Sequence, residues 1–95
     1  MKQQKVYEKD IKVRLKKWEA KVDELKAKLD TADAQTRESI YKEVERLQEL
    51  QQKAKDKLRS LKHAGKESFD DIKTGVENAV KSFGEAVDSA LSRFK

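Results

Sequence analysis

Apolar side chains recur along this chain at a spacing that predicts helices packed through narrow seams. In the first segment the intervals between them alternate between four and three residues, which is the a/d repeat of a coiled coil. The residues at these positions are Ile11, Leu15, Trp18, Val22, Leu25, Leu29 and Ala32. A second segment repeats the pattern with Ile40, Val44, Leu47, Gln51, Ala54, Leu58 and Leu61. Both segments are therefore expected to be helical.

The third segment carries one apolar stripe with a different repeat. Its members are Phe69, Ile72, Val76, Val80, Phe83, Val87, Leu91 and Phe94. Residues 76–83 align with residues 87–94 at a spacing of eleven. Such a repeat corresponds to about 3.67 residues per turn, so a nearly straight helix is expected. Gly75 and Gly84 lie inside this helix, where each costs about 1 kcal/mol relative to alanine, and a packing or functional reason for them is expected.

One reversal of the chain is predicted near Gly65. Lys62 and His63 suit the last turn of a helix, because cations interact favourably with its carboxyl end. Gly65 can take the left-handed conformation that often ends a helix. A turn over residues 64–67 is thus expected, followed by a helix over about 67–94.

Residues 30–39 leave the topology open. This stretch has no large apolar residue, and the polar Asp33 and Thr36 fall on the seam. If it contains a turn at 31–36, three helices of nearly equal length fold up-down-up into a monomeric bundle. These helices would span about residues 6–30, 37–63 and 67–94.

The favoured prediction is instead one long helix over about 5–63 that forms a coiled-coil hairpin with the returning helix. Residues 30–39 lack glycine and proline, and Trp18, Leu29 and Ile40 keep a spacing of eleven across them, as in a coiled coil that continues through a four-residue insertion. Such a helix would be about 85 Å long, roughly twice the length of its partner. Half of its seam would need another chain, so the hairpin predicts an elongated homo-oligomer.

Charged residues beside the seams predict which helices are neighbours. The flanks of the first seam are mainly basic and include Arg14 and Lys21, whereas Asp70, Glu77 and Asp88 form an acidic edge on the third segment. Opposite edges favour the first and third helices as neighbours. Exposed ion pairs contribute only about 0 to 1 kcal/mol each, so they would select the arrangement more than stabilise it.

A second row of small apolar residues lies on the first helix, opposite the main seam. It recurs every seven residues and consists of Val6, Val13, Ala20, Ala27 and Ala34. Small residues are common on solvated helices, which is one interpretation. The other is that the first helix makes contacts on two faces, as in an assembly of more than two helices.

The composition fits a small helical domain and excludes several classes of protein. Of the 95 residues, 43% are charged and 36% are hydrophobic, so a core of several layers is excluded. The absence of cysteine rules out disulfides, thiol nucleophiles and sulfur-ligated zinc or iron sites. No apolar run approaches the roughly 20 residues of a membrane-spanning helix, and none follows the basic amino terminus as in a secretory signal. A single domain, 1–95, in the cytoplasm is expected.

Little in the sequence suggests catalysis. His63 is the single histidine, whereas a transition-metal site or a catalytic triad needs several groups held around a cleft. No glycine-rich phosphate loop is present. We expect a protein that is not an enzyme, with no cofactor, metal site or small-molecule substrate. The side chains expected to matter are those that pack the seams: Trp18, Leu25, Leu29, Leu47, Leu58, Phe69, Val76, Phe83, Leu91 and Phe94.

Self-association through the seams is the favoured function, and two rivals follow from other features. The helix over 67–94 has three phenylalanines on one stripe, and residues 66–95 carry five basic and six acidic groups, a net charge of only −1, which suits a membrane surface with loosely packed lipid. Nucleic acid is a less favoured partner. The net charge is +5 and residues 53–59 are rich in cations, but Asp56 interrupts that run and no aromatic residue alternates with it.

Three segments resemble the small bacterial coiled-coil proteins that are associated with stress responses and whose function is otherwise unknown. They are Trp18-Glu-Ala-Lys-Val-Asp-Glu-Leu-Lys-Ala-Lys28, Leu61-Lys-His-Ala-Gly65 and Ile72-Lys-Thr-Gly-Val-Glu-Asn-Ala-Val80. The likeness covers most of the chain, and its motifs are largely those of any helix of this kind. Tryptophans often occupy the positions that Phe69 and Val80 hold here. The resemblance implies a cytoplasmic helical protein linked to stress, without catalytic residues or a cofactor.

Overall fold

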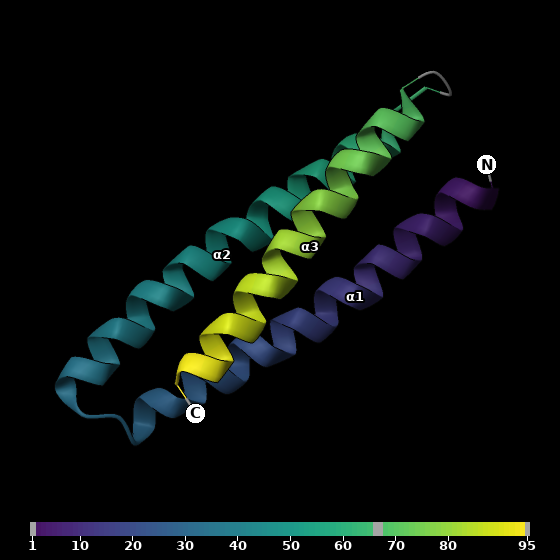
Figure 1. Ribbon diagram of the computed structural model, residues 1–95. Coiled ribbons are helices and arrows are strands. Elements are labelled where there is room, and N and C mark those ends of the chain that lie inside the picture. The colour runs from purple at the N-terminus through teal and green to yellow at the C-terminus, as the bar shows by residue number, and fades with distance from the viewer. Residues whose placement is uncertain (1, 66–67, 95) are drawn as a thin grey trace.

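The protein is built from helices that follow the apolar seams. The computed structural model describes residues 2–65 and 68–94, with side chains from residue 5 onward, and no strand occurs in this part of the chain. The elements are α1 (Lys2–Ala27), a short 3-10 helix η1 (Lys28–Asp30), α2 (Ala34–Lys62) and α3 (Phe69–Arg93) (Figure 1). The predicted all-α class is thereby confirmed.

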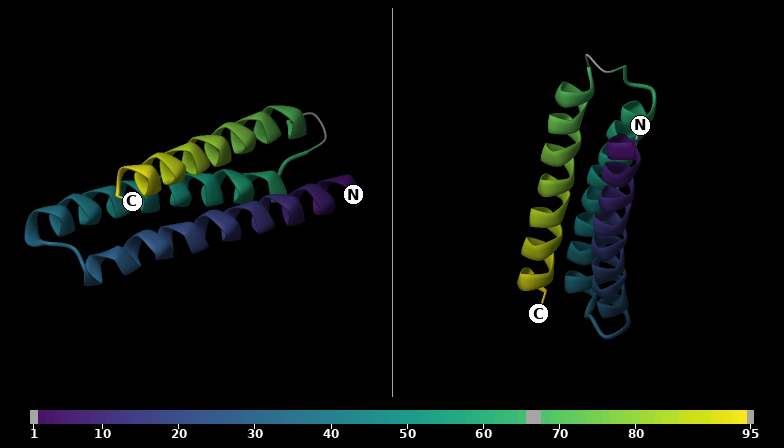
Figure 2. Two further views of the ribbon diagram at one scale, coloured as in Figure 1. Left: turned by 60° about the horizontal axis from the view of Figure 1, so that its bottom comes forward. Right: turned by 90° about the vertical axis from the view of Figure 1, so that its right-hand side faces the viewer.

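The three long helices run up, down and up beside one another (Figure 2). Each pair of helices is in contact, and the bundle measures 51 × 17 × 17 Å along its principal axes. This is the three-helix alternative with a second turn. The favoured continuous helix over 5–63 is accordingly corrected to two helices, α1 and α2, that fold back on each other.

The second turn is built without glycine or proline. α1 tightens into η1, and the amide of Thr31 donates to the carbonyl of Lys28 at 3.3 Å. Asp33 then caps α2, because its carboxylate accepts the amide of Thr36 at 2.7 Å, and this bond lowers the pKa of Asp33. An aspartate at this position satisfies a free amide and interacts favourably with the helix dipole. A polar stretch with such a cap is sufficient to interrupt the helix.

The seams of all three helices meet in one apolar core. No polar or charged side chain is buried among the residues that the structure describes. The buried side chains are Ile11, Leu15, Val22, Leu25, Ile40, Val44, Leu47, Ala54, Leu58, Leu61, Val76, Val80, Phe83, Val87 and Ala90. Because one chain closes its own seams, the unpartnered half-seam on which the expected oligomer depended is absent from this arrangement.

The ten side chains expected to pack the seams all lie in or against this core. Five are buried, namely Leu25, Leu47, Leu58, Val76 and Phe83. The other five are partly buried and pack against the core, namely Trp18, Leu29, Phe69, Leu91 and Phe94. Changes from a large residue to alanine at buried positions cost about 2 to 5 kcal/mol each, so these side chains account for much of the stability of the fold.

The reversal predicted near Gly65 begins where α2 ends. The last turn of α2 tightens, and the amide of Ala64 donates to the carbonyl of Leu61 at 3.2 Å. Gly65 does not have a positive φ, so the expected left-handed cap is not formed. The tightened turn satisfies a terminal carbonyl instead. Residues 66 and 67, which belong to the predicted turn, lie outside the described residues.

Candidate interaction surfaces

Ion pairs join α1 to α3 along one edge of the core. Arg14 Nη1 lies 3.2 Å from Glu77 Oε2, and Lys21 Nζ lies 3.4 Å from Asp88 Oδ1. These pairs confirm the expectation that the basic flank of the first helix meets the acidic edge of the third. Their side chains are at least one-third exposed, so each pair contributes little stability and mainly selects the neighbour.

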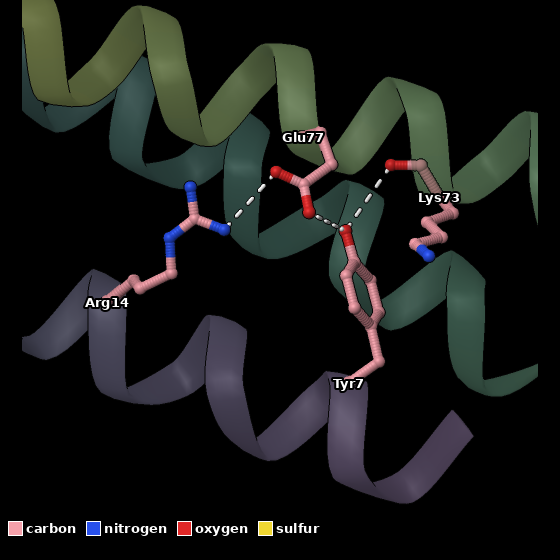
Figure 3. A network of polar contacts seen from close by, with 4 residues as sticks. All are labelled: Tyr7, Arg14, Lys73 and Glu77. Atoms are coloured by element: carbon pink, nitrogen blue, oxygen red, sulfur yellow. Dashed lines mark hydrogen bonds and ion pairs between the residues drawn. The ribbon is translucent and has the colours of Figure 1, made fainter. Parts of the chain in front are cut away.

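Tyr7 extends this edge into a hydrogen-bond network. Its hydroxyl donates to Glu77 Oε1 at 2.9 Å and lies 3.4 Å from the carbonyl oxygen of Lys73 (Figure 3). The ring of Tyr7 also meets the ring of Phe69 edge-on, with 6.4 Å between centroids. The sequence interpretation missed Tyr7, although it lies four residues before Ile11 and so continues the first seam backwards.

The network shifts the pKa values of both its acidic groups. Burial raises the pKa of the Tyr7 hydroxyl, and the hydrogen bond to Glu77 raises it further. Burial alone would raise the pKa of Glu77 as well. The hydrogen bonds from Tyr7 and Arg14, with the charges of Arg14 and Lys73, outweigh it and hold the pKa of Glu77 below its usual value. Glu77 is thus an ionised acceptor that links two helices.

The Trp18 indole packs against α3 at Gly84, where a side chain would collide with it. A Cβ atom on Gly84 would lie 2.7 Å from Cε2 and Cζ2 of the Trp18 indole. The Lys21 ammonium lies 4.8 Å from the centroid of the same ring, which is close enough for a cation–π interaction. The expected packing reason is therefore found for Gly84. A Cβ on Gly75 would meet only the Lys57 side chain, at 3.8 Å.

The other helix pairs are also joined by polar side chains at the margin of the core. Glu19 on α1 accepts a hydrogen bond from Gln51 on α2 and lies 3.1 Å from Lys55 Nζ. Glu43 on α2 lies 3.9 Å from Arg93 on α3. Gln51 is the one polar residue of the second seam, so its amide is used to fix the register of α1 against α2.

These polar contacts hold the three helices together at the margin of the core. The surfaces that remain for binding a partner are the outward faces of the bundle. Within residues 2–65 and 68–94, no group of three or more His, Cys, Asp or Glu side chains could hold a metal ion. His63 is exposed beside the end of α2.

One outward face contains a groove between α1 and α2 with a volume of about 390 Å³. Its floor includes Leu15 and Leu58, which are only 4% and 5% exposed. Its rims carry five cations and one acid, namely Lys12, Lys16, Glu19, Lys55, Arg59 and Lys62. We call this surface the basic groove. It exists because the turn at 31–33 brings two distant cationic segments together.

Several cations of the basic groove are available to a partner. Lys12, Lys16 and Lys62 form no ion pair with any residue in the described part of the chain. Lys55 is paired with Glu19, and Arg59 lies 3.9 Å from Asp56 on its own helix. With Glu19 as the single acid, the groove has a net charge of +4.

A second outward face carries the row of small residues on α1. Val6 and Val13 are 68% and 62% exposed. Ala20 and Ala27 continue the row and are also exposed, as is Ala34 at the start of α2. This row therefore faces away from both neighbouring helices within the chain.

The apolar stripe of α3, by contrast, points inward. Val76, Val80, Phe83 and Val87 are each at most 1% exposed, because α1 and α2 cover them. A lipid surface could reach this stripe only if α3 separated from the other two helices.

Comparison with known proteins gives no function for these surfaces. No protein family, curated protein or solved structure matches this chain. In the described part of the chain, none of the helices has both the length and the apolar character needed to cross a membrane.

Proposed function

We propose that this protein is a non-catalytic helical interaction module that binds an anionic macromolecule along the basic groove. The observation that carries the proposal is the gathering of Lys12, Lys16, Lys55, Arg59 and Lys62 around one groove with a single acid, Glu19. A cleft lined by one sign of charge raises the local concentration of oppositely charged partners. The proposal includes the cytoplasmic location and the link to stress that the family resemblance implies.

Charge, more than apolar contact, would supply the affinity. Leu15 and Leu58 are almost completely covered by the bundle itself, so little apolar surface remains for a partner to bury. Three of the five cations have no ion pair within the described residues, so no existing ion pair has to be broken when they bind a partner. Binding of this kind weakens steeply as salt is added.

Self-association, the function favoured by the sequence, is the second candidate. Because the seams are closed within one chain, it would have to use the outward row on α1, where Val6 and Val13 are largely exposed. Sedimentation equilibrium tests it. Self-association predicts a mass above 11.0 kDa that Val13→Glu lowers, whereas the monomer mass of 11.0 kDa at all concentrations rejects it.

Membrane binding through α3 is less favoured, because its apolar stripe is covered in the bundle. It would require the bundle to open, with loss of the contacts around Phe83 and Val80. Failure to co-sediment with highly curved vesicles, at full helicity in water, would remove this alternative.

Retention on immobilised heparin, a polyanion, tests the main proposal. In one variant Lys12, Lys16 and Lys62 are replaced by glutamine. In the control, Lys42, Lys53 and Lys81 are replaced in the same way; these lysines are exposed and do not line the groove. Both variants lose three positive charges and therefore have the same net charge, and the control also loses the exposed ion pair of Lys42 with Glu38.

We expect the groove variant to elute at clearly lower salt than the wild type, with the control close to the wild type. Circular dichroism should give the same helicity for all three proteins. Equal elution of the two variants would mean that net charge alone governs retention and would reject the basic groove as the binding site.

A further inference from the structure

The cations around the basic groove form two rows that follow the helix axes. On α1, Lys12 and Lys16 continue the row of Lys5 and Lys9, at intervals of four, three and four residues. All four side chains are exposed. Residues at such intervals lie on one face of a helix. The α1 row is therefore about 16 Å long at 1.5 Å per residue.

The second row lies on α2 and runs antiparallel to the first. It consists of Lys55, Arg59 and Lys62, at intervals of four and three residues, and is about 10 Å long. The axes of packed helices lie about 8 to 10 Å apart. Because α1 and α2 lie side by side and antiparallel (Figures 1 and 2), the two rows of cations run roughly parallel along the basic groove.

Two lines of positive charge suit a ligand with two lines of negative charge. Double-stranded DNA carries phosphates in two such lines, with one charge per 3.4 Å of axis on each strand. Because each strand winds around the axis, its phosphates lie further apart along the strand than along the axis, and a row about 10 to 16 Å long would meet roughly two to three of them. We infer that the basic groove binds the phosphate backbone of duplex DNA, with α1 and α2 each following one strand. This inference rests on the proposed function, whose anionic partner it identifies.

The chemistry of the lining predicts that binding does not depend on base sequence. Four of the five cations are lysines, which act as point charges on phosphate and not as planar forks that read a base edge. None of the described residues that line the groove is aromatic, so unpaired bases have no surface on which to stack. Duplex DNA is accordingly favoured over a single strand.

Other anionic partners fit the groove less well. An acidic helix docked between α1 and α2 would need apolar anchors, but Leu15 and Leu58 are almost fully covered. A membrane surface would need large apolar side chains beside the cations, and the lining offers none that is exposed. Duplex RNA is recognised by its shape and by 2′-hydroxyl and phosphate contacts across a wide minor groove, and of these the two rows of lysine supply only the phosphate contacts.

The test is fluorescence anisotropy with a duplex of about 25 base pairs at several salt concentrations. Neutralising about four to five phosphates predicts a slope of log K against log salt of about −4. Between 50 and 200 mM salt the affinity should then fall about 250-fold. The variant with glutamine at positions 12, 16 and 62 should give a slope of about −2, because three phosphate contacts are lost.

Two further variants keep the test decisive. The control with Lys42, Lys53 and Lys81 changed to glutamine should keep the slope near −4, since these residues lie outside the groove. Replacing Lys12, Lys16 and Lys62 by arginine keeps the charge and should also preserve the slope. Two duplexes of unrelated sequence should bind within about twofold of each other, and the single strand should bind more weakly.

Four outcomes would overturn the assignment to duplex DNA. They are groove-dependent heparin retention without DNA binding, equal affinity for the single strand, more than tenfold preference for one sequence, and tighter groove-dependent binding of duplex RNA, polyglutamate or phosphatidylglycerol vesicles. Each leaves anion binding by the groove intact. If the wild-type protein is not retained on heparin, both the proposed function and this inference are rejected.

Discussion

At the scale of single residues, two glycines in the same helix have opposite roles. Gly84 makes room for the Trp18 indole, whereas Gly75 faces only the flexible side chain of Lys57. The two positions therefore separate the intrinsic cost of glycine in a helix from the steric value of a missing Cβ.

Substitution of each glycine by alanine should change stability in opposite directions. Gly84→Ala forces the Trp18 ring to move, and overpacking of about 1 to 3 kcal/mol should exceed the gain of about 1 kcal/mol in helix propensity. Gly75→Ala should stabilise by up to about 1 kcal/mol, because its Cβ makes only an ordinary contact. Urea denaturation of both variants checks this. Equal stability of the two would contradict the close packing of Trp18 on α3.

A second residue-scale prediction concerns Tyr7 and the charge of Glu77. The pKa of Glu77 is lower in the folded protein than its usual value of about 4.5. The ionised carboxylate therefore contributes its full stabilisation of the fold above about pH 4.5, and this stabilisation is lost as the pH falls through the lower pKa of the folded state. Tyr7→Phe removes a hydrogen bond to this carboxylate and should cost about 1 kcal/mol at pH 7. The cost should shrink below about pH 4.5, as Glu77 becomes protonated.

The matched control for this prediction is Tyr41→Phe. Tyr41 is 58% exposed and forms no hydrogen bond through its side chain within the described residues. The stability cost of Tyr41→Phe should be close to zero at every pH. A cost for Tyr7→Phe that equals that of Tyr41→Phe, or that grows in acid, would show that the hydroxyl does not stabilise an ionised Glu77.

At the scale of elements, the turn between α1 and α2 decides the topology. Asp33 is its main signal, because its carboxylate accepts the Thr36 amide and begins α2. Asp33→Ala should lower the melting temperature by several degrees. Asp33→Asn, which keeps an acceptor oxygen, should lose less. If residues 28–33 continued one helix, alanine would be the better helix former and Asp33→Ala would raise the melting temperature instead.

The helices themselves could be predicted, whereas their topology could not be decided. Alternating intervals of three and four residues are a local property, so residues such as Leu25, Leu47 and Val76 identify the seams and the core. The turn at 31–33 has no glycine or proline. A capped turn and a continuous helix are nearly equal in local free energy at this position. What distinguishes them is the closure of three seams within one chain, which no local pattern contains.

The basic groove was beyond local analysis for a related reason. Lys12 and Lys16 are about forty residues away from Lys55 and Arg59 in the sequence. They lie on one groove only when α1 and α2 are antiparallel neighbours. Within its own segment, each row is an ordinary charged helix face. The α1–α3 ion pairs, by contrast, followed from whole edges of opposite sign, which do not depend on the exact register.

At the scale of the whole molecule, closure of the core determines what the surface can do. The seams and the α3 stripe are used to hold three helices together, so they offer no partner an apolar face. The charges remain outside. The proposed partner binds these exposed charges, and DNA binding should leave the core unchanged.

Small-angle X-ray scattering of the dilute protein tests this closure most directly. A three-helix monomer predicts a radius of gyration close to the 15.4 Å of the Cα trace and a maximum dimension somewhat above 51 Å. A hairpin with one helix over 5–63 would instead give a particle at least about 85 Å long with the mass of an oligomer. That second result would contradict the bundle and, with it, the groove on which the proposed function depends.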